Sequence, residues 1–208
     1  MRLVKAVVVF AVCAAAAKQF PAVSQVLVKA LLIGAAILLI RLEGGKLSEY
    51  GFVRPVHARW WKILAPGLLI GALSSFGALA FGFDGMRKII GAYPLWQLLL
   101  AVFFWSSLSE EIFCRGWFQR ESIPQSAALF GLMHTSLFFS GVDTPSVLWI
   151  VLSTTALGYS CALVRAEYGS WIPAFVRHAA FNFGGPIGGI VYTIGYRLIT
   201  GHLPAISS

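Results

Sequence analysis

Charged residues are scarce in this sequence, and acidic residues are scarcer still. Only 12% of the 208 residues are charged, with eight Asp and Glu against sixteen Lys and Arg, while 58% are hydrophobic. A soluble domain carries about 25% charged residues, so this composition excludes an ordinary soluble protein. It predicts a polytopic membrane protein, in which any acidic residue that touches an apolar segment is a functional candidate.

Paired cysteines and a nucleic-acid-binding pattern are also missing. Cys13, Cys114 and Cys161 stand singly within or at the ends of apolar runs, and no CxxC pair occurs. Isolated cysteines in odd number favour reduced thiols over a disulfide framework or a cysteine zinc site. The formal charge of +8 comes from basic residues that lie mostly in loops between apolar runs, where they act as topology determinants. We therefore expect no nucleic-acid partner.

The chain has no internal repeats, low-complexity tracts or linkers, which predicts a single integral membrane domain over residues 1–208. Crossing about 30 Å of hydrocarbon requires roughly 20 apolar residues. Segments of that kind lie near 3–17, 22–40, 64–83, 94–114, 123–140, 146–164, 171–184 and 186–200. GGPIGG (184–189) fits either a turn between short helices or a break within one long helix. We expect an all-α transmembrane bundle of eight spans, or seven.

The first apolar segment has two interpretations. Its basic start, apolar middle and small residues in MRLVKAVVVFAVCAAAAKQF resemble a signal peptide. A second apolar segment follows almost at once, and such helical hairpins insert as pairs. We therefore favour an uncleaved anchor over a cleaved signal.

The basic residues predict the orientation of the bundle. With a cytoplasmic N-terminus, the outside segments hold only Lys18, Arg87 and Lys88, as the positive-inside rule expects. The inside segments then hold Arg2, Lys5, Arg41, Lys46, Arg54, Arg59, Lys62, Arg115, Arg120 and Arg165. This orientation places the sequence EE at 110–111 near the cytoplasmic end of the fourth span.

Two adjacent glutamates close the apolar run that leads into SLSEEIFCRGWFQR (107–120). On a helix, Glu111 and Arg115 are four residues apart and can form an ion pair on one face. Glu110 is turned by about 100° from that face and is expected to stay free. A free carboxylate in a low-dielectric pocket suits proton transfer from water. The alternative is that both glutamates reach the headgroup region.

Two further polar patterns lie within apolar segments. His134 is near the middle of one, where a single histidine often serves as a helix-contact residue. His178 and Asn182 are one helical turn apart and share a face, which presents two hydrogen-bond donors or an interhelical contact. Because burying such groups separately costs a few kcal/mol each, we expect one shared polar site around a water-filled cavity.

These segments carry three motifs in order. EEIFCR (110–115), FGLMH (130–134) and HAAFN (178–182) match EExxxR, FxxxH and HxxxN, and GSWIPAFVRHAAFN gives the last of them its context. The pattern resembles the CAAX-protease and bacteriocin-processing family of intramembrane endopeptidases, also called CPBP or Abi, over residues 95–185. The short loops resemble those of bacterial members, which implies the cytoplasmic membrane of a bacterium.

The resemblance implies a helical bundle that encloses a conical cavity open to the cytosol. It implies that Glu110 and His134 activate water, that His178 and Asn182 form an oxyanion hole, and that Glu111 and Arg115 fix Glu110. The substrate would be a membrane-associated protein or peptide, cut near its terminus.

The choice between metal-dependent and metal-independent chemistry is open in this pattern. Glu110, His134 and His178 could supply three zinc ligands, with water as the fourth. HExxH is absent, however, and an asparagine beside His178 suits an oxyanion donor better. We therefore expect a glutamate mechanism without a cofactor, with zinc as the runner-up.

Other functions are weighed by the residues that they require. No GxSG serine motif occurs, and Asp84 and Asp143 fall in loops rather than in spans, which excludes serine and aspartyl intramembrane proteases. A small transporter should show repeated halves with broken helices, and none is visible. A catalytically inactive membrane scaffold or a small transporter that uses the same polar cluster stays as the alternative to a peptidase.

Overall fold

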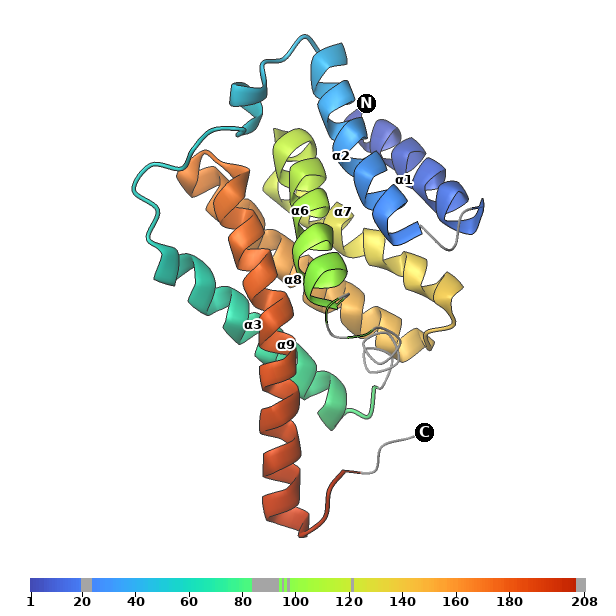
Figure 1. Cartoon of the computed structure of the whole chain (residues 1–208), viewed down its shortest axis with the longest axis vertical. Helices are drawn as coiled ribbons and strands as arrows, with labels where there is room; N and C mark the ends of the chain where they lie inside the picture. Colours follow the sequence, from blue (N-terminus) through green and yellow to red (C-terminus); the bar gives the residue numbers. More distant parts are fainter. Residues whose placement is uncertain (20–23, 84–93, 95, 97, 121, 205–208) are drawn as a thin grey trace.

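The computed structural model describes residues 1–19, 24–83, 94, 96, 98–120 and 122–204. Within these ranges the chain is helical and contains no strand, which confirms the all-α prediction. Figure 1 shows the α-helices: α1 (Arg2–Gln19), α2 (Ser24–Leu42), α3 (Trp60–Ala80), α6 (Ser107–Glu111), α7 (Ile123–Met133), α8 (Thr144–Tyr168) and α9 (Trp171–Thr200). The 3-10 helices are η2 (Leu47–Tyr50), η5 (Phe118–Arg120) and η6 (His134–Ser140), and the π-helices are η3 (Leu98–Ser106) and η4 (Ile112–Trp117).

The predicted number of spans is not confirmed. Among the described residues, α3 and α8 are the two helices long and apolar enough to cross a membrane. The predicted segments 171–184 and 186–200 are one continuous helix, α9, with Pro186 inside it. GGPIGG therefore forms neither a turn nor a break, because its glycines let α9 pack closely along α3.

The contact between α3 and α9 depends on four glycines. Gly67 and Gly71 are one turn apart on α3, as are Gly184 and Gly188 on α9. A Cβ on Gly71 would collide with a backbone carbonyl of α9, and a Cβ on Gly184 would collide with one of α3. Such small-xxx-small spacing allows helix backbones to approach each other in a membrane. The two helices cross in Figure 1, and α9 carries two of the predicted site residues.

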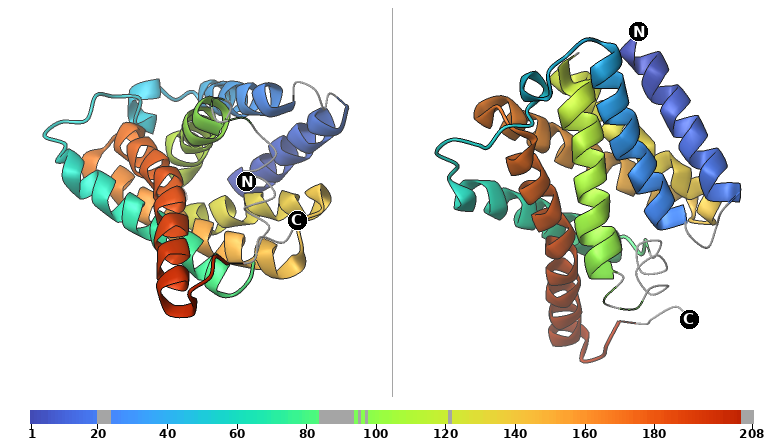
Figure 2. Two further views of the ribbon diagram at one scale, coloured as in Figure 1. Left: turned by 60° about the horizontal axis from the view of Figure 1, so that its bottom comes forward. Right: turned by 45° about the horizontal axis from the view of Figure 1, so that its top comes forward.

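Residues 98–120 form the central helix, which is made of η3, α6, η4 and η5. Figure 2 shows it between α2 on one side and α9 on the other. The five α-helical residues of α6 have π-helical segments on both sides, Leu98–Ser106 and Ile112–Trp117. π-helical turns are rare and occur frequently at functional sites. Here they flank Glu110 and Glu111.

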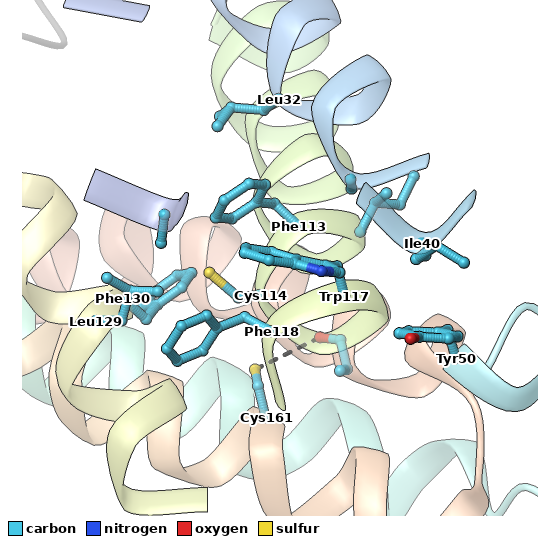
Figure 3. Packing of buried hydrophobic residues seen from close by; sticks show 14 of the residues in the cluster. Leu32, Ile40, Tyr50, Phe113, Cys114, Trp117, Phe118, Leu129, Phe130 and Cys161 are labelled. Carbon is cyan, nitrogen blue, oxygen red and sulfur yellow. Dashed lines mark hydrogen bonds between the residues drawn. The ribbon is translucent and has the colours of Figure 1, made fainter. Parts of the chain in front are cut away.

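The main apolar core lies around the second half of the central helix. Phe113, Cys114, Trp117 and Phe118 are buried there (Figure 3). Leu32 and Ile40 of α2, Leu129 and Phe130 of α7, and Cys161 of α8 complete it in the figure. Burial of these side chains fixes the central helix against its neighbours. All three cysteines of the chain are free and buried.

Capping side chains fix the first residues of the helices that follow. Ser122, Asp143 and Ser170 accept hydrogen bonds from Gln125, Ser146 and Ile172 at the starts of α7, α8 and α9. Each cap supplies an acceptor that the first turn of a helix otherwise lacks. Asp143 is thus a cap, as expected of a loop residue, whereas Asp84 lies outside the described residues.

Glu43, just after α2, forms a polar cluster with four donors. Arg2 and Lys5 of α1, Tyr50 of η2 and Trp117 of the central helix all donate to its carboxylate. Burial alone would raise the pKa of Glu43, but these hydrogen bonds lower it to about 2. The cluster ties the N-terminal hairpin of α1 and α2 to the central helix.

Candidate active site

The six predicted site residues come from three segments of the fold. The central helix holds Glu110, Glu111 and Arg115; His134 is the first residue of η6; and α9 holds His178 and Asn182. Glu110, Glu111, Arg115 and His178 are at least nine-tenths buried, whereas His134 and Asn182 are half-buried. Charged and polar groups are therefore concentrated inside an otherwise apolar bundle.

Glu111 is the centre of this arrangement. Its Oε2 lies 3.1 Å from Arg115 Nε, and its Oε1 lies 3.0 Å from His178 Nδ1. The contact with Arg115 is an ion pair without aligned hydrogen-bond geometry. The Arg115 guanidinium also donates to Ser126 Oγ at 2.5 Å and to the Gly158 carbonyl at 2.8 Å. The predicted pair of Glu111 and Arg115 is confirmed, and it is anchored to α7 and α8.

The partner of His178 defines the roles of its two ring nitrogens. A carboxylate only accepts hydrogen bonds, so Nδ1 of His178 carries the proton and donates to Glu111. When His178 is protonated, Nε2 becomes a second donor. This arrangement allows His178 to donate a hydrogen bond to an anionic oxygen.

Asn182, one turn after His178 on α9, also faces the central helix. Its Nδ2 donates to Ser107 Oγ at 2.9 Å, and Ser107 in turn donates to the Phe103 carbonyl at 2.7 Å. Ser107 and Glu111 are four residues apart, as are His178 and Asn182. The prediction that His178 and Asn182 share one face of α9 is therefore confirmed. An amide nitrogen has two protons, so Asn182 retains one donor beyond Ser107.

Glu110 has a partner that was not predicted. Lys29 Nζ, from α2, lies 2.9 Å from Glu110 Oε1. The expectation that Glu110 stays free is therefore wrong, because α2 packs beside the central helix and brings an ammonium group to it. A signal for this pair was present in the sequence: Lys29 interrupts the apolar segment 22–40, and an ionisable residue inside such a segment requires a partner.

His134 contacts the cluster through an aromatic ring. Its Nδ1 lies 2.9 Å from the Phe130 carbonyl, which only accepts, so Nδ1 donates and Nε2 of the neutral ring accepts. The Phe130 ring lies 5.4 Å from the ring of His134 and 5.2 Å from that of His178, centroid to centroid. The Arg115 guanidinium lies 5.1 Å above the same ring.

Glu110 and the two histidines are near one another without direct bonds. Glu110 is within electrostatic range of His134 and His178, but no hydrogen bond joins it to either ring in the described part of the chain. Nor does any group of three or more His, Cys, Asp and Glu there have the arrangement needed to hold a metal ion.

The conical cavity implied by the resemblance is not confirmed. A hollow of about 330 Å³ lies at the start of α9 and is lined by Arg54, Pro55, Ala58, Trp60 and Ile172. None of the six predicted residues lines it.

Comparison with known proteins gives one match. Residues 92–184 match the family model Rce1-like, described as Type II CAAX prenyl endopeptidase Rce1-like. The matched segment contains all six predicted site residues but not Lys29. No curated protein and no solved structure matches the chain.

Proposed function

We propose that the chain, which matches the Rce1-like family of CAAX prenyl endopeptidases over residues 92–184, is an intramembrane endopeptidase. It hydrolyses a peptide bond near the terminus of a membrane-associated protein or peptide. The family match supports a membrane-bound hydrolase that acts on protein substrates. The polar residues of the central helix, η6 and α9 lie close together, which supports this region as the site of the reaction.

The contact between Glu111 and His178 is the observation that carries the mechanism. It supports a fixed orientation of the His178 ring, in which Nε2, when it carries a proton, donates to the substrate oxygen beside the second amide proton of Asn182. These two donors stabilise the negative charge that develops on the carbonyl oxygen during attack by water. Glu111 and Arg115 then act as the charged pair that orients His178. No contact between this pair and Glu110 among the described residues supports the prediction that the pair fixes Glu110.

Glu110 is the general base in this proposal. Its carboxylate takes a proton from water, the water oxygen bonds to the carbonyl carbon, and the C=O electron pair moves onto oxygen. When that pair returns, the C–N bond breaks, and the leaving nitrogen takes the proton back from Glu110. His134 holds the water through Nε2, which the bond from Nδ1 to the Phe130 carbonyl leaves as an acceptor.

The proposal includes no metal. The zinc alternative would use Glu110, His134 and His178 as ligands. Incubation with a chelator separates the two, because loss of cleavage that added zinc restores would favour the zinc mechanism. Cleavage that survives the chelator supports the glutamate mechanism.

The proposed orientation places the N-terminus and the opening of the site in the cytoplasm, in the inner membrane of a bacterium. In the same proposal, further helices besides α3 and α8 cross the bilayer. The distribution of Lys and Arg supports this orientation. Cysteine accessibility at Lys46→Cys and Lys88→Cys, which the proposal places on opposite sides, tests it in intact cells.

The substitution Glu110→Gln tests the function. We expect cleavage of a membrane-bound reporter peptide to fall by a factor of about 10² to 10⁴, which is the usual contribution of a general base. Protein level and membrane insertion should stay unchanged. Normal processing by this variant contradicts the role of Glu110, and an inactive scaffold would show no cleavage even with the unmodified chain.

A further inference from the structure

Lys29 connects two parts of the chain that the sequence does not link. It lies on α2, outside the matched residues 92–184 and 81 positions away from Glu110. Figure 2 shows α2 alongside the central helix. The N-terminal hairpin thus delivers an ammonium group to the carboxylate that is proposed to act on water.

The ion pair of Lys29 and Glu110 is largely shielded from solvent. The side chains of Lys29 and Glu110 are 15% and 9% exposed. Burying a carboxylate without a counter-charge is costly, because the charge loses its hydration. The neighbouring cation, Arg115, already contacts Glu111. Lys29 is therefore the cation that compensates Glu110.

The contact uses only one of the two carboxylate oxygens. Lys29 binds Oε1, whereas Oε2 has no hydrogen bond to any described residue and is not enclosed in the protein. Without such a contact, rotation about the χ3 torsion of Glu110 would exchange the positions of its two carboxylate oxygens. The ammonium holds one oxygen and leaves the other as the open proton acceptor.

We infer that Lys29 is a positioning residue for the reaction, which holds Glu110 ionised and directs its Oε2 toward the water. The inference rests on the proposed function of Glu110. The groups that face Glu110 are Lys29 from α2, His134 from η6 and His178 from α9, besides Glu111 and Arg115 on its own helix. Among the described residues, Lys29 is the basic side chain in direct contact with it.

The test compares kcat and KM for a reporter peptide in proteoliposomes that hold the full chain. Lys29→Met removes the ammonium but keeps the length of the side chain. We expect its kcat to fall by roughly tenfold to a hundredfold, as misplaced catalytic groups do, with KM within about twofold. Lys29→Arg restores a donor and a charge and should keep kcat within about threefold of the unmodified enzyme.

Arg41→Met is the matched control, because it removes an exposed positive charge from the same helix. Its kcat should be unchanged. If Lys29→Met is absent from the membrane, Lys29→Gln takes its place, with the same expected loss of kcat.

Three results overturn the inference. One is an unchanged or higher kcat in Lys29→Met. Another is a loss that falls on KM alone. The last is equal loss of kcat in Lys29→Arg and Lys29→Met, which indicates a structural role. The unmodified chain and Glu110→Gln, run in parallel, keep the two proposals apart. If the unmodified chain does not cleave, or Glu110→Gln cleaves normally, the proposed function fails instead.

Discussion

Glu43 and Glu110 are two acidic residues in very different surroundings. Glu43 accepts hydrogen bonds from four side chains, whereas Glu110 accepts one, from Lys29. Glu110 is nevertheless the more buried of the two, with a side chain 9% exposed against 17% for Glu43. The number of donors, rather than the depth of burial, separates a carboxylate that fastens helices from one that has an oxygen available for chemistry.

Glu111 lies between these extremes, since its two oxygens contact Arg115 and His178. It has no oxygen to spare, yet its partner His178 has a free ring nitrogen. In this account, Glu43 is structural, Glu110 acts on water, and Glu111 acts through His178.

Glu111→Gln should have the largest effect on stability. It leaves the guanidinium of Arg115 buried without its counter-charge, which typically costs about 3–5 kcal/mol. Cleavage should be lost as well, because His178 loses the carboxylate that orients its ring. Thermal unfolding in detergent, together with the reporter assay, measures both. A fully stable Glu111→Gln would show that Arg115 finds its compensation elsewhere.

Asn182→Ala should reduce kcat by a factor of about 10² to 10³, the usual effect of removing one oxyanion donor. The control is Ser107→Ala, which removes the partner of Asn182 but not the proposed donor. It should cost less than tenfold, since Asn182 keeps its amide. If the two variants lose the same activity, Asn182 acts only as a helix contact.

Glu43→Gln should lower stability by about 1.5–3 kcal/mol and leave kcat unchanged. The side chains of Arg2 and Glu43 are only 13% and 17% exposed, and hydrogen bonds to a charged group in such surroundings contribute about that much. Thermal unfolding and the reporter assay again give the two values. A loss of kcat without a loss of stability would place Glu43 in the reaction and break its contrast with Glu110.

Acid should weaken the Glu43 cluster in a defined range. Its pKa is lowered from 4.5 to about 2 in the folded chain, so the stabilisation is complete above about pH 4.5. It is lost progressively as the pH falls toward 2. The difference in melting temperature between the unmodified chain and Glu43→Gln should therefore shrink over this range. A difference that stays constant would contradict the assignment.

The features that could be predicted from the sequence depend on the spacing of residues within one helix. The ion pair of Glu111 and Arg115 and the shared face of His178 and Asn182 follow from helical geometry alone, because each pair is four residues apart. All-α architecture follows from apolar segments that need internal backbone hydrogen bonds in a membrane.

Long-range packing explains what the sequence could not predict. The contact between Lys29 and Glu110 depends on how α2 docks on the central helix. A lysine inside an apolar segment indicates that a partner is needed, but not which residue it is. The continuous α9 was also ambiguous, because glycines and a proline usually interrupt helices. Here the glycines serve close packing against α3 instead.

The most direct test measures kcat and melting temperature side by side for Glu110→Gln and Glu43→Gln. We expect Glu110→Gln to lose cleavage and Glu43→Gln to retain it, while both variants lose melting temperature because each leaves basic side chains without their carboxylate. Equal cleavage by the two variants would contradict the claim that an open carboxylate oxygen marks the acid that acts on water.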